Sequence, residues 1–283
     1  MRSLLAVPAT NPRFLEKAAQ SVADAVFIDL EDAVVPELKV EARAKAIAAI
    51  NGIDWGHRRL GVRVNDLTTA WGAGDLVELA KAAPRLAFVI LPKCDTPRDV
   101  AAADAMLRGA DIRLFGLVES ARGVAECEAI AGAAPRMAGL IFGPGDYSLD
   151  LGVLDGSLDT RFALARVANA ARAFGLDAID GPWFEIANAE GLRGACLRAA
   201  ALGCGGKMAI HPSQVEIANE VFSPSAQQLA WAREVLDAMA AAGEQGRGAV
   251  KTRDGKMIDL VHIKIARKVL ERAQSNDNRR SNP

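Results

Sequence analysis

The feature of this sequence that most restricts its fold is a series of eight short aliphatic runs separated by polar turns and helical patterns. The runs are continuously apolar rather than alternating, which is typical of parallel strands buried on both faces. Their spacing is that of repeated strand–helix units. We place the eight runs at residues 3–9, 25–32, 60–65, 87–93, 113–120, 139–146, 178–183 and 206–212.

Eight such units predict an α/β fold, a closed (β/α)8 TIM barrel, because closure pairs every strand and buries both faces of the sheet. Helical patterns between the runs include residues 36–50, 124–131 and 157–174. A doubly wound open sheet is the structural alternative. Such a sheet normally has a glycine-rich phosphate-binding turn after its first strand, whereas the sequence here reads PATNP.

The strand–helix pattern ends near Phe222, and the remainder of the chain predicts a C-terminal helical extension. Residues 226–242 and 257–274 have helical patterns, and a segment with four glycines, residues 243–256, joins them. A loop of this length between helices is uncommon unless it is functional. We therefore divide the chain into a barrel at 1–222, a helical arm at 223–274 and a disordered tail at 275–283.

Composition excludes several classes of protein. The formal net charge of −1 lacks the basic excess of a nucleic-acid-binding protein. No run reaches the ~18 apolar residues of a membrane span, and the N-terminal apolar run stops at Pro8, too early for a signal peptide. The four cysteines form no CxxC pair, which indicates reduced structural thiols. We expect a cytoplasmic protein that binds neither nucleic acid nor membrane.

Polar side chains at the C-terminal ends of the predicted strands mark the expected active site, because the active sites of such barrels lie at that end. Charged and polar residues at the tips of apolar strands are also the informative exceptions to burial. These residues are Asp29, Glu31, Asp32, Arg63, Asn65, Lys93, Glu119, Asp146, Asp180 and His211.

Glu119 and Asp146 stand at equivalent points of adjacent predicted strands. Two converging carboxylates without a neighbouring Cys or His pair suit a hard cation such as Mg²⁺, which commonly takes one or two carboxylates and completes its shell with water and substrate oxygens. Alternatively, each carboxylate caps the helix that follows it or pairs with an arginine such as Arg122. The spacing by itself leaves both interpretations open.

The basic residues at the strand ends have two interpretations each. Arg63 lies on a buried strand and needs an anionic partner, which is either a substrate carboxylate or an ion pair with Asp29 or Glu31. Lys93 would suit a Schiff base, although a lysine in a Pro-Lys turn is more often solvated or ion-paired. His211 is either a base or a residue that anchors its loop by a hydrogen bond.

The motifs of the chain resemble those of the HpcH/HpaI aldolase and citrate lyase beta-subunit family, and most closely those of the citrate lyase beta-like, malyl-CoA and citramalyl-CoA lyases. The matching stretches run in order along nearly the whole chain. They are RSLLAVPATNP (2–12), FIDLEDAV (27–34), K-x2-AR (39–43), VRVN (62–65), LPK (91–93), GLVESARGV (116–124), GLIFGPGDYSLDLG (139–152), GKMAIHPSQV (206–215) and DGKMIDLVHIKIA (254–266).

The resemblance implies roles for the residues at the strand ends. The positions of Glu119 and Asp146 match the Mg²⁺ ligands of the family. Arg63 matches the arginine that binds the carboxylate end of the substrate and helps to hold its oxygen. Glu31 and Asp32 match carboxylates that lie near the metal and bind its waters.

The resemblance also implies an oligomer, usually a trimer or hexamer, in which the C-terminal extension reaches toward a neighbouring subunit. Asp259 of the MID motif matches the acid/base group that lies over the neighbour's active site. Ile210, His211 and Pro212 match the segment that helps to form the coenzyme A site. We expect the segment at 243–256 to act as a hinge and lid, and we expect the pKa of Asp259 to be raised.

The activity implied by the resemblance is Mg²⁺-dependent carbon–carbon cleavage or formation of a 3-hydroxy-3-carboxyl acyl-CoA, such as malyl-CoA or citramalyl-CoA, giving a 2-oxo acid and an acetyl-CoA-type thioester. The alternatives are a malyl-CoA-type thioesterase and a citryl-thioester lyase subunit fed by an acyl carrier. Two others are an aldolase acting on free 2-oxo acids and a non-catalytic metabolite-binding barrel. Two departures from the family's pattern, Gly145 and the strand-seven stretch IDGPWFEIAN, put the identity of the acyl group in doubt.

Overall fold

The computed structural model describes residues 1–244, 248–251 and 255–281. The chain forms two compact units, Met1–Phe222 and Ser223–Pro283. None of the helices in the described residues has the length and apolar composition that a membrane crossing requires.

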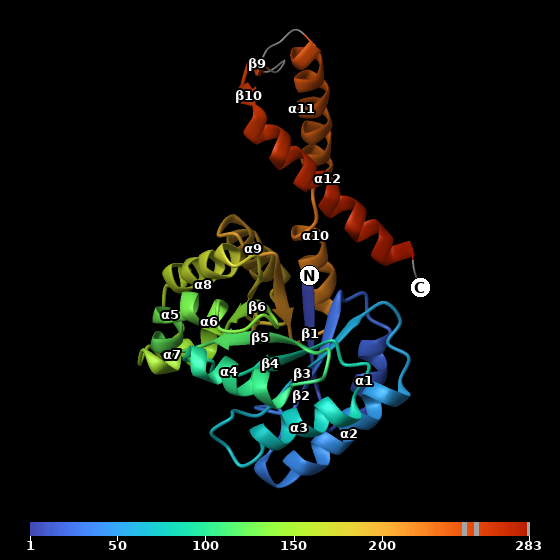
Figure 1. The fold of residues 1–283 in the computed structure, drawn as a ribbon, viewed down its shortest axis with the longest axis vertical. Coiled ribbons are helices and arrows are strands. Elements are labelled where there is room, and N and C mark those ends of the chain that lie inside the picture. The colour runs from blue at the N-terminus through green and yellow to red at the C-terminus, as the bar shows by residue number, and fades with distance from the viewer. Residues whose placement is uncertain (245–247, 252–254, 282–283) are drawn as a thin grey trace. The chain divides into compact units, whose positions relative to one another are not determined.

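The first unit is a closed barrel of eight parallel strands in sequence order, in which β1 pairs with both β2 and β8 (Figure 1). The predicted barrel is therefore confirmed, and the open-sheet alternative is wrong. The strands are β1 (Ser3–Pro8), β2 (Ala25–Asp29), β3 (Arg59–Arg63), β4 (Phe88–Leu91), β5 (Arg113–Val118), β6 (Met137–Phe142), β7 (Asp177–Asp180) and β8 (Gly206–Ala209).

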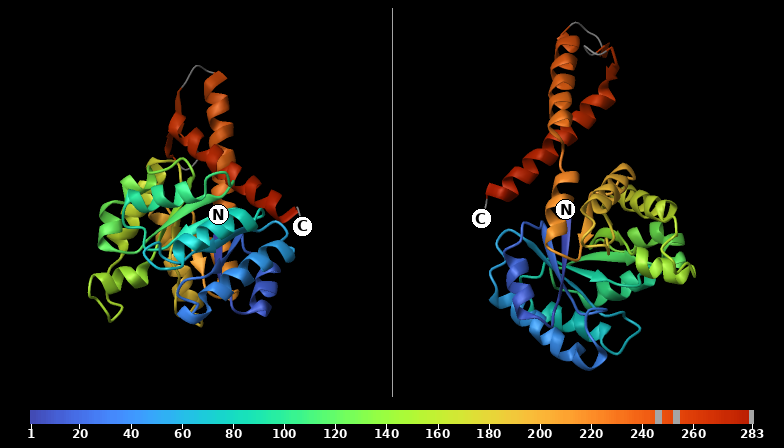
Figure 2. Two further views of the ribbon diagram at one scale, coloured as in Figure 1. Left: turned by 60° about the horizontal axis from the view of Figure 1, so that its bottom comes forward. Right: turned by 180° about the vertical axis from the view of Figure 1, so that it is seen from behind.

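Helices follow the strands and surround the barrel (Figure 2). The predicted helix at 124–131 is two short helices, and the one predicted from residue 157 begins at Arg161, after a turn in which Asp159 accepts the Arg161 backbone N–H. The helices are α1 (Pro12–Ala19), the 3-10 helix η1 (Pro36–Leu38), α2 (Lys39–Gly52), α3 (Gly72–Ala82), α4 (Pro97–Met106), α5 (Ala121–Ala125), α6 (Cys127–Ala131), α7 (Pro144–Asp150), α8 (Arg161–Ala173), α9 (Ala189–Ala201) and α10 (Ser213–Val221).

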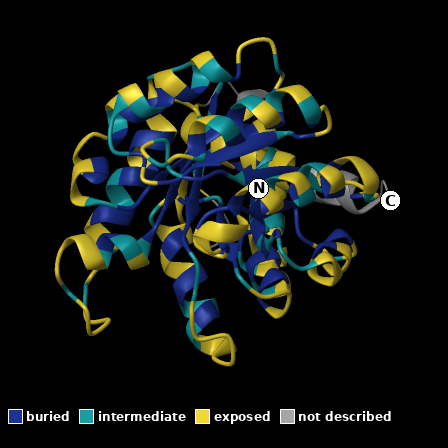
Figure 3. Ribbon diagram, turned by 90° about the horizontal axis from the view of Figure 1, so that it is seen from below, coloured by how far each residue is buried: buried dark blue, intermediate teal, exposed yellow. Residues whose placement is uncertain are grey.

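Phenylalanines fill part of the barrel interior, where the rings of Phe88 and Phe115 meet edge to face with centroids 5.1 Å apart. Glycines on neighbouring strands make this possible. A Cβ on Gly61 would lie 2.1 Å from the Phe88 ring, and one on Gly139 would lie 2.3 Å from the Phe115 ring. The strands are buried, whereas the helices expose their outer faces (Figure 3). The four cysteines are also buried, and burial raises the pKa of each thiol, so they are poor nucleophiles.

The second unit consists of two helices and a short antiparallel hairpin. They are α11 (Ala226–Glu244), β9 (Ala249–Lys251), β10 (Met257–Asp259) and α12 (Leu260–Ser281). Ile258 of the hairpin packs with apolar residues of both helices, including Val235 and Ala266. Part of the segment predicted as a loop at 243–256 is therefore strand, while residues 245–247 and 252–254 lie outside the described residues.

The predicted C-terminal tail differs from the structure. Helix α12 continues to Ser281, past residue 275 where the sequence predicted disorder, and residues 282–283 lie outside the described residues. The reason is that no proline or glycine interrupts the chain between Gly255 and Pro283, so nothing in this stretch removes a helical hydrogen bond.

Candidate active site

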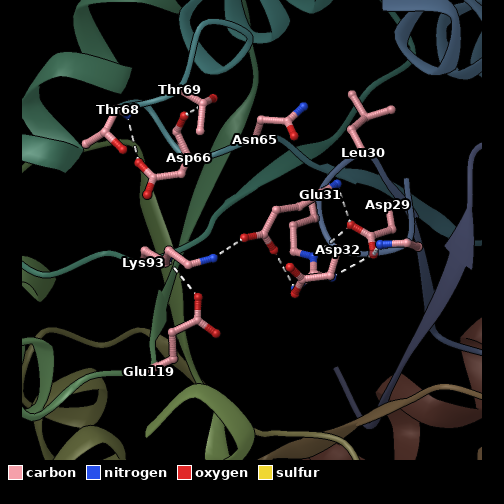
Figure 4. A network of polar contacts seen from close by, with 12 residues as sticks. Asp29, Leu30, Glu31, Asp32, Asn65, Asp66, Thr68, Thr69, Lys93 and Glu119 are labelled. Carbon is pink, nitrogen blue, oxygen red and sulfur yellow. Dashed lines mark hydrogen bonds and ion pairs between the residues drawn. The ribbon is translucent and has the colours of Figure 1, made fainter. Parts of the chain in front are cut away.

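Strands β2 and β3 and the turn after β2 bring Arg63 and three carboxylates together at the C-terminal end of the barrel. Figure 4 shows these carboxylates, Asp29, Glu31 and Asp32, with Lys93 and Glu119 nearby. Asp29 and Arg63 are register partners, and Arg63 donates from Nε to Asp29 Oδ1 at 2.8 Å and from Nη2 to Oδ2 at 2.6 Å. Its Nη1 lies 2.8 Å from Glu31 Oε2 and 3.3 Å from Asp32 Oδ2. The ion pair that the sequence left open for Arg63 is therefore present. Burial alone would lower the pKa of Arg63, but the hydrogen bonds and charges of these carboxylates outweigh burial and raise it.

Lys93, directly after β4, connects two of the site's carboxylates. Its ammonium group forms an ion pair with Glu31, and its backbone N–H donates to Glu119 Oε1 at 2.8 Å. Lys93 adopts a φ of 46°, the only positive φ of a non-glycine residue in the described part of the chain. Such a backbone costs free energy for a residue with a side chain and is often found at functional sites. The ion pair with Glu31, working against burial, raises the pKa of Lys93 to about 12. A permanently charged lysine does not suit a Schiff base, so the ion-paired interpretation holds.

Glu119 directly follows β5, whereas Asp146 lies in the first turn of α7, beyond the end of β6 at Phe142, so the two are not at the equivalent strand ends that the sequence predicted. Glu119 is only 4% exposed, and burial, reinforced by the charge of Asp146, raises its pKa to about 8. The turn after β6 approaches it closely, since a Cβ on Gly143 would lie 2.6 Å from Glu119 Oε2. The hydroxyl of Ser120, rather than Glu119, caps α5 by accepting the N–H of Gly123 at 2.9 Å. Among the ion pairs found between described residues, none joins Arg122 to either carboxylate.

The charges around these groups are unbalanced and fit a bound cation. Three basic side chains face five carboxylates: the basic residues are Arg63, Lys93 and Lys39, and the acidic ones are Asp29, Glu31, Asp32, Glu119 and Asp146. Glu31 Oε2 is buried without a hydrogen bond. Arg63 Nη1 lies 2.8 Å away and forms an ion pair with this oxygen, but its N–H groups do not point at it. The described residues contain no group of three metal-ligating side chains. The pair of Glu119 and Asp146 therefore fits Mg²⁺, which needs few protein ligands, better than a metal that requires a full protein shell.

Two cavities reach these carboxylates. The central cavity, of about 390 Å³, is lined by Arg63, Glu119 and Asp146 and by apolar residues such as Phe27 and Met208. The polar cavity, of about 450 Å³, shares the two carboxylates and is lined further by polar loop residues that include Lys93, Asp66 and Arg122, together with a few apolar ones such as Leu67. A small polar ligand can therefore reach the pair from solvent.

The IHP segment after β8 contributes one residue to the central cavity, Ile210. Its backbone N–H donates to Gln214 Oε1 at 2.9 Å. His211 is exposed, with Nδ1 2.8 Å from the hydroxyl of Ser213, and Pro212 is exposed at the start of α10. The imidazole thus anchors its own loop by a hydrogen bond, the second of the two roles that the sequence left open for His211.

Asp259 belongs to the second unit, at the end of β10, and its carboxylate is exposed. Its Oδ1 lies 2.8 Å from His262 Nδ1 and accepts the backbone N–H of Val261 at 2.9 Å. The hydrogen bond from His262, with that from Val261, lowers the pKa of Asp259. In the single chain the carboxylate is neither desolvated nor beside another negative charge, so the closed site in which the pKa of Asp259 is expected to be raised is not formed here and the expectation stays a prediction.

Two residues, Asp29 and Lys93, have a larger part in the site than the sequence indicated. Both were visible as polar residues at strand ends. Their importance comes from contacts that cross strands, the bidentate hold on Arg63 and the backbone hydrogen bond to Glu119. Glu31, by contrast, lines neither cavity and acts on Arg63 and Lys93, whereas Asp32 faces the central cavity.

Comparison with known proteins agrees with the fold. The model of the HpcH/HpaI aldolase/citrate lyase family matches residues 2–212. An L-malyl-CoA/beta-methylmalyl-CoA lyase of Cereibacter sphaeroides is 36% identical, in a match that covers 94% of this chain and 92% of the lyase. A (3S)-malyl-CoA thioesterase of the same species is 37% identical, in a match that covers 97% of this chain and 95% of the thioesterase. The crystal structure of protein CitE from Mycobacterium tuberculosis, in complex with magnesium, acetoacetate and coenzyme A, covers 97% of this chain and 100% of its own at 32% identity with a TM-score of 0.79.

The family match and the lyases among its relatives identify the chain as an enzyme of the carbon–carbon lyase class. The chain belongs to the HpcH/HpaI aldolase/citrate lyase family.

Proposed function

We propose that this protein is a Mg²⁺-dependent lyase that cleaves or forms a 3-hydroxy-3-carboxyl acyl-CoA, such as malyl-CoA or citramalyl-CoA, with a 2-oxo acid and an acetyl-CoA-type thioester as the other side of the reaction. The observation that carries the proposal is the buried Glu119 beside Asp146 at the meeting point of two cavities. The likeness to the malyl-CoA/beta-methylmalyl-CoA lyases supports the substrate class.

Glu119 and Asp146 are the residues that would hold Mg²⁺. When bound there, the ion supplies a Lewis acid that polarises the carboxylate and hydroxyl or keto oxygens of the substrate. The chain prepares this position in advance, because the backbone N–H of Lys93 fixes one oxygen of Glu119 and leaves the other facing the turn at Gly143. Lys93 and Arg63 keep the remaining carboxylates paired.

Arg63 orients the carboxylate end of the substrate in this proposal. A guanidinium has five N–H donors. Asp29 takes one from Nε and one from Nη2, and Nη1 faces Glu31 and Asp32, which leaves a second N–H on Nη2. The acidic neighbours hold the guanidinium rigid, and its charge then lies where negative charge develops on the substrate oxygen. Asp32, with its side chain 60% exposed, is placed to order water at the cavity mouth.

The proton step belongs to Asp259. In cleavage the thioester enolate gains a proton at carbon, and in synthesis a carboxylate removes that proton. We propose that the Asp259 of a neighbouring subunit does this over each barrel, in a cytoplasmic homotrimer or hexamer, and that the segment Ile210, His211 and Pro212 borders the coenzyme A site. Covering the carboxylate would desolvate it and raise the pKa of Asp259 from the lowered value in the single chain.

A malyl-CoA thioesterase is the second candidate, because a relative of that name is 37% identical over nearly the whole chain. The same site would serve, with water as the final nucleophile. The two activities differ in their products, since only the lyase gives a 2-oxo acid together with an intact acyl-CoA.

The test is an activity screen of the full chain with malyl-, β-methylmalyl- and citramalyl-CoA and Mg²⁺, with identification of products. A 2-oxo acid formed with acetyl- or propionyl-CoA supports the lyase, and free CoA with malate supports the thioesterase. Chelation should abolish turnover. Full activity after chelation, or in Glu119→Gln, would exclude the metal site. No turnover of any thioester would overturn the proposed function.

A further inference from the structure

A second apolar cavity adjoins the central one and plays no part in the chemistry above. This side cavity, of about 470 Å³, lies between the loops that follow β6 and β7. Glu185 is the one charged residue among the described residues that line it. Its apolar lining comes mainly from Leu149, Val153, Leu154, Leu158, Trp183 and Phe184.

The two cavities share a wall made of Pro144, Gly145, Pro182 and Phe184. Phe184 is 64% exposed, so no packed core holds its ring in place. Its ring lies over Gly145, where a Cβ would come within 3.6 Å of Phe184 Cζ. Gly145 and the loop after β7 are the positions at which the sequence departs from its family's pattern. A larger residue at 145 would meet the ring, so the two departures are physically coupled.

The backbone that carries Phe184 is braced although its ring is not. The buried Gln214 accepts the N–H of Ile210 with Oε1 and donates from Nε2 to the carbonyl of Trp183 at 2.8 Å. On the other side, Gly181 packs so tightly that a Cβ would lie 2.3 Å from Pro144 Cδ. The ring therefore stands on a fixed loop and can turn without moving the metal-facing residues.

The central cavity has an apolar wall that borders further empty space. The ends of β2, β3, β5 and β6 present charged side chains, and the proposed coenzyme A edge lies at Ile210. The uncharged sides are the end of β1, at Ala6–Pro8, and the shared wall, and of these two it is the shared wall that also lines the side cavity. An aliphatic substituent next to the reacting carbon would be least costly to bury there.

We infer that Phe184, lying over Gly145, limits the size of the aliphatic substituent that this site accepts on its thioester substrate, and that the side cavity is the space from which the ring excludes longer chains. This inference rests on the proposed function. It makes Phe184 a specificity-determining residue that takes no part in bond cleavage.

The experiment compares kcat/KM for malyl-CoA, β-methylmalyl-CoA and an analogue with a butyl group in place of the methyl group. Phe184→Ala joins the two cavities. The kcat/KM for the butyl analogue, divided by that for β-methylmalyl-CoA, should therefore rise at least ~10-fold, which is the lower end of what one methylene is worth in an apolar pocket. Gly145→Leu should act in the opposite direction and lower the ratio of β-methylmalyl-CoA to malyl-CoA. Both residues are exposed, and thermal unfolding checks that each variant is folded.

Phe162→Ala is the matched control, because Phe162 is an exposed phenylalanine, 70% accessible, that does not line either cavity. Its ratios should equal those of the unaltered protein. If the variants turn over malyl-CoA but all show the same ratios of kcat/KM between the thioesters, the inference about Phe184 is overturned while the proposed function stands. Absence of turnover by the unaltered protein with every thioester would overturn the proposed function and the inference with it.

Discussion

At the scale of single residues, the acidity of Glu119 controls whether the site can take a metal. Its pKa of about 8 means that the buried carboxyl is protonated in the metal-free protein at neutral pH. The proton must leave before a cation binds, because the ligand is the carboxylate. Metal affinity and proton release are therefore coupled at this one side chain.

We predict that Mg²⁺ affinity rises by up to about tenfold per pH unit below pH 8 and levels off above it, since Glu119 has its pKa raised to about 8. Titration calorimetry in buffers of different ionisation enthalpy should detect release of nearly one proton at neutral pH. Glu119→Gln is the control: it removes a proposed ligand, so Mg²⁺ binding and the proton release that accompanies it should both be lost. An affinity that is flat across this range would contradict the raised pKa.

Without metal, the same shift predicts how stability changes with pH. Between the ordinary pKa of 4.5 and about 8 the folded state holds a proton that the unfolded state has lost. The contribution of Glu119 to stability is therefore fully present below 4.5 and declines as pH rises through 8. Urea unfolding of the metal-free protein should show this trend, and Glu119→Gln should show less of it. An equal trend in both proteins would assign it to other groups.

Lys93 gives a third prediction at this scale, because its φ of 46° favours glycine. Lys93→Ala and Lys93→Gly both remove the ammonium that pairs with Glu31, so both should be less stable than the unaltered protein. The glycine variant should nevertheless be the more stable of the two by about 1 kcal/mol, since a Cβ is strained in this region. Chemical unfolding measures the difference. An alanine variant equal to or more stable than the glycine variant would show that the backbone relaxes.

At the scale of elements, the position of Asp146 depends on how the loop after β7 packs against the start of α7. A Cβ on Gly181 would lie 2.3 Å from Pro144 Cδ and 2.4 Å from the carbonyl oxygen of Phe142. These atoms are ring and backbone, and they cannot move aside as a flexible side chain would.

We therefore predict that Gly181→Ala destabilises the fold by about 1–3 kcal/mol, as overpacking typically does, and also weakens Mg²⁺ binding by displacing α7. Gly52→Ala is the matched control, because nothing lies within 4 Å of a Cβ there and its effect should be small. Thermal unfolding and metal titration report the two effects separately. Unchanged metal affinity in a destabilised Gly181→Ala would show that α7 holds Asp146 without this contact.

At the scale of the whole molecule, the candidate chemistry is divided between the two compact units. Glu119, Asp146 and Arg63 belong to Met1–Phe222, whereas Asp259 belongs to Ser223–Pro283. The exposed carboxylate of Asp259, with its lowered pKa, is not in the environment that proton transfer to carbon requires.

The proposed sharing of each site between two subunits predicts that two inactive variants restore activity when they are mixed. Asp259→Ala and Glu119→Gln homo-oligomers should each be inactive, and co-refolded mixtures should recover up to about a quarter of full activity, because each site then draws on two different chains. Glu119→Gln is preferable to Arg63→Ala as the barrel variant, since removing Arg63 leaves three carboxylates without their shared partner. No recovery in verified mixed oligomers would place Asp259 outside the shared site.

Much of the architecture could be predicted from the sequence, because eight continuous aliphatic runs at strand–helix spacing favour a closed barrel, and the first turn lacks the glycines expected of the open-sheet alternative. The strand ends were less predictable. The second run was read to Asp32, yet β2 ends at Asp29, because residues beyond it leave the ladder to surround Arg63. The pattern predicted a helix only to residue 274, whereas α12 continues to Ser281, because no glycine or proline ends it earlier.

The sequence by itself determined the barrel and the presence of Arg63, Glu119 and Asp146 at or just after strand ends, since alternation of apolar runs and turns is a local property of the chain. Only the tertiary structure decided how these residues act on one another. The bidentate hold of Asp29 on Arg63, the left-handed backbone of Lys93 and the raised pKa of Glu119 all depend on burial and on neighbours from other strands. Such contacts join residues distant in sequence, and their energies are set by distance and desolvation, which a linear pattern does not contain.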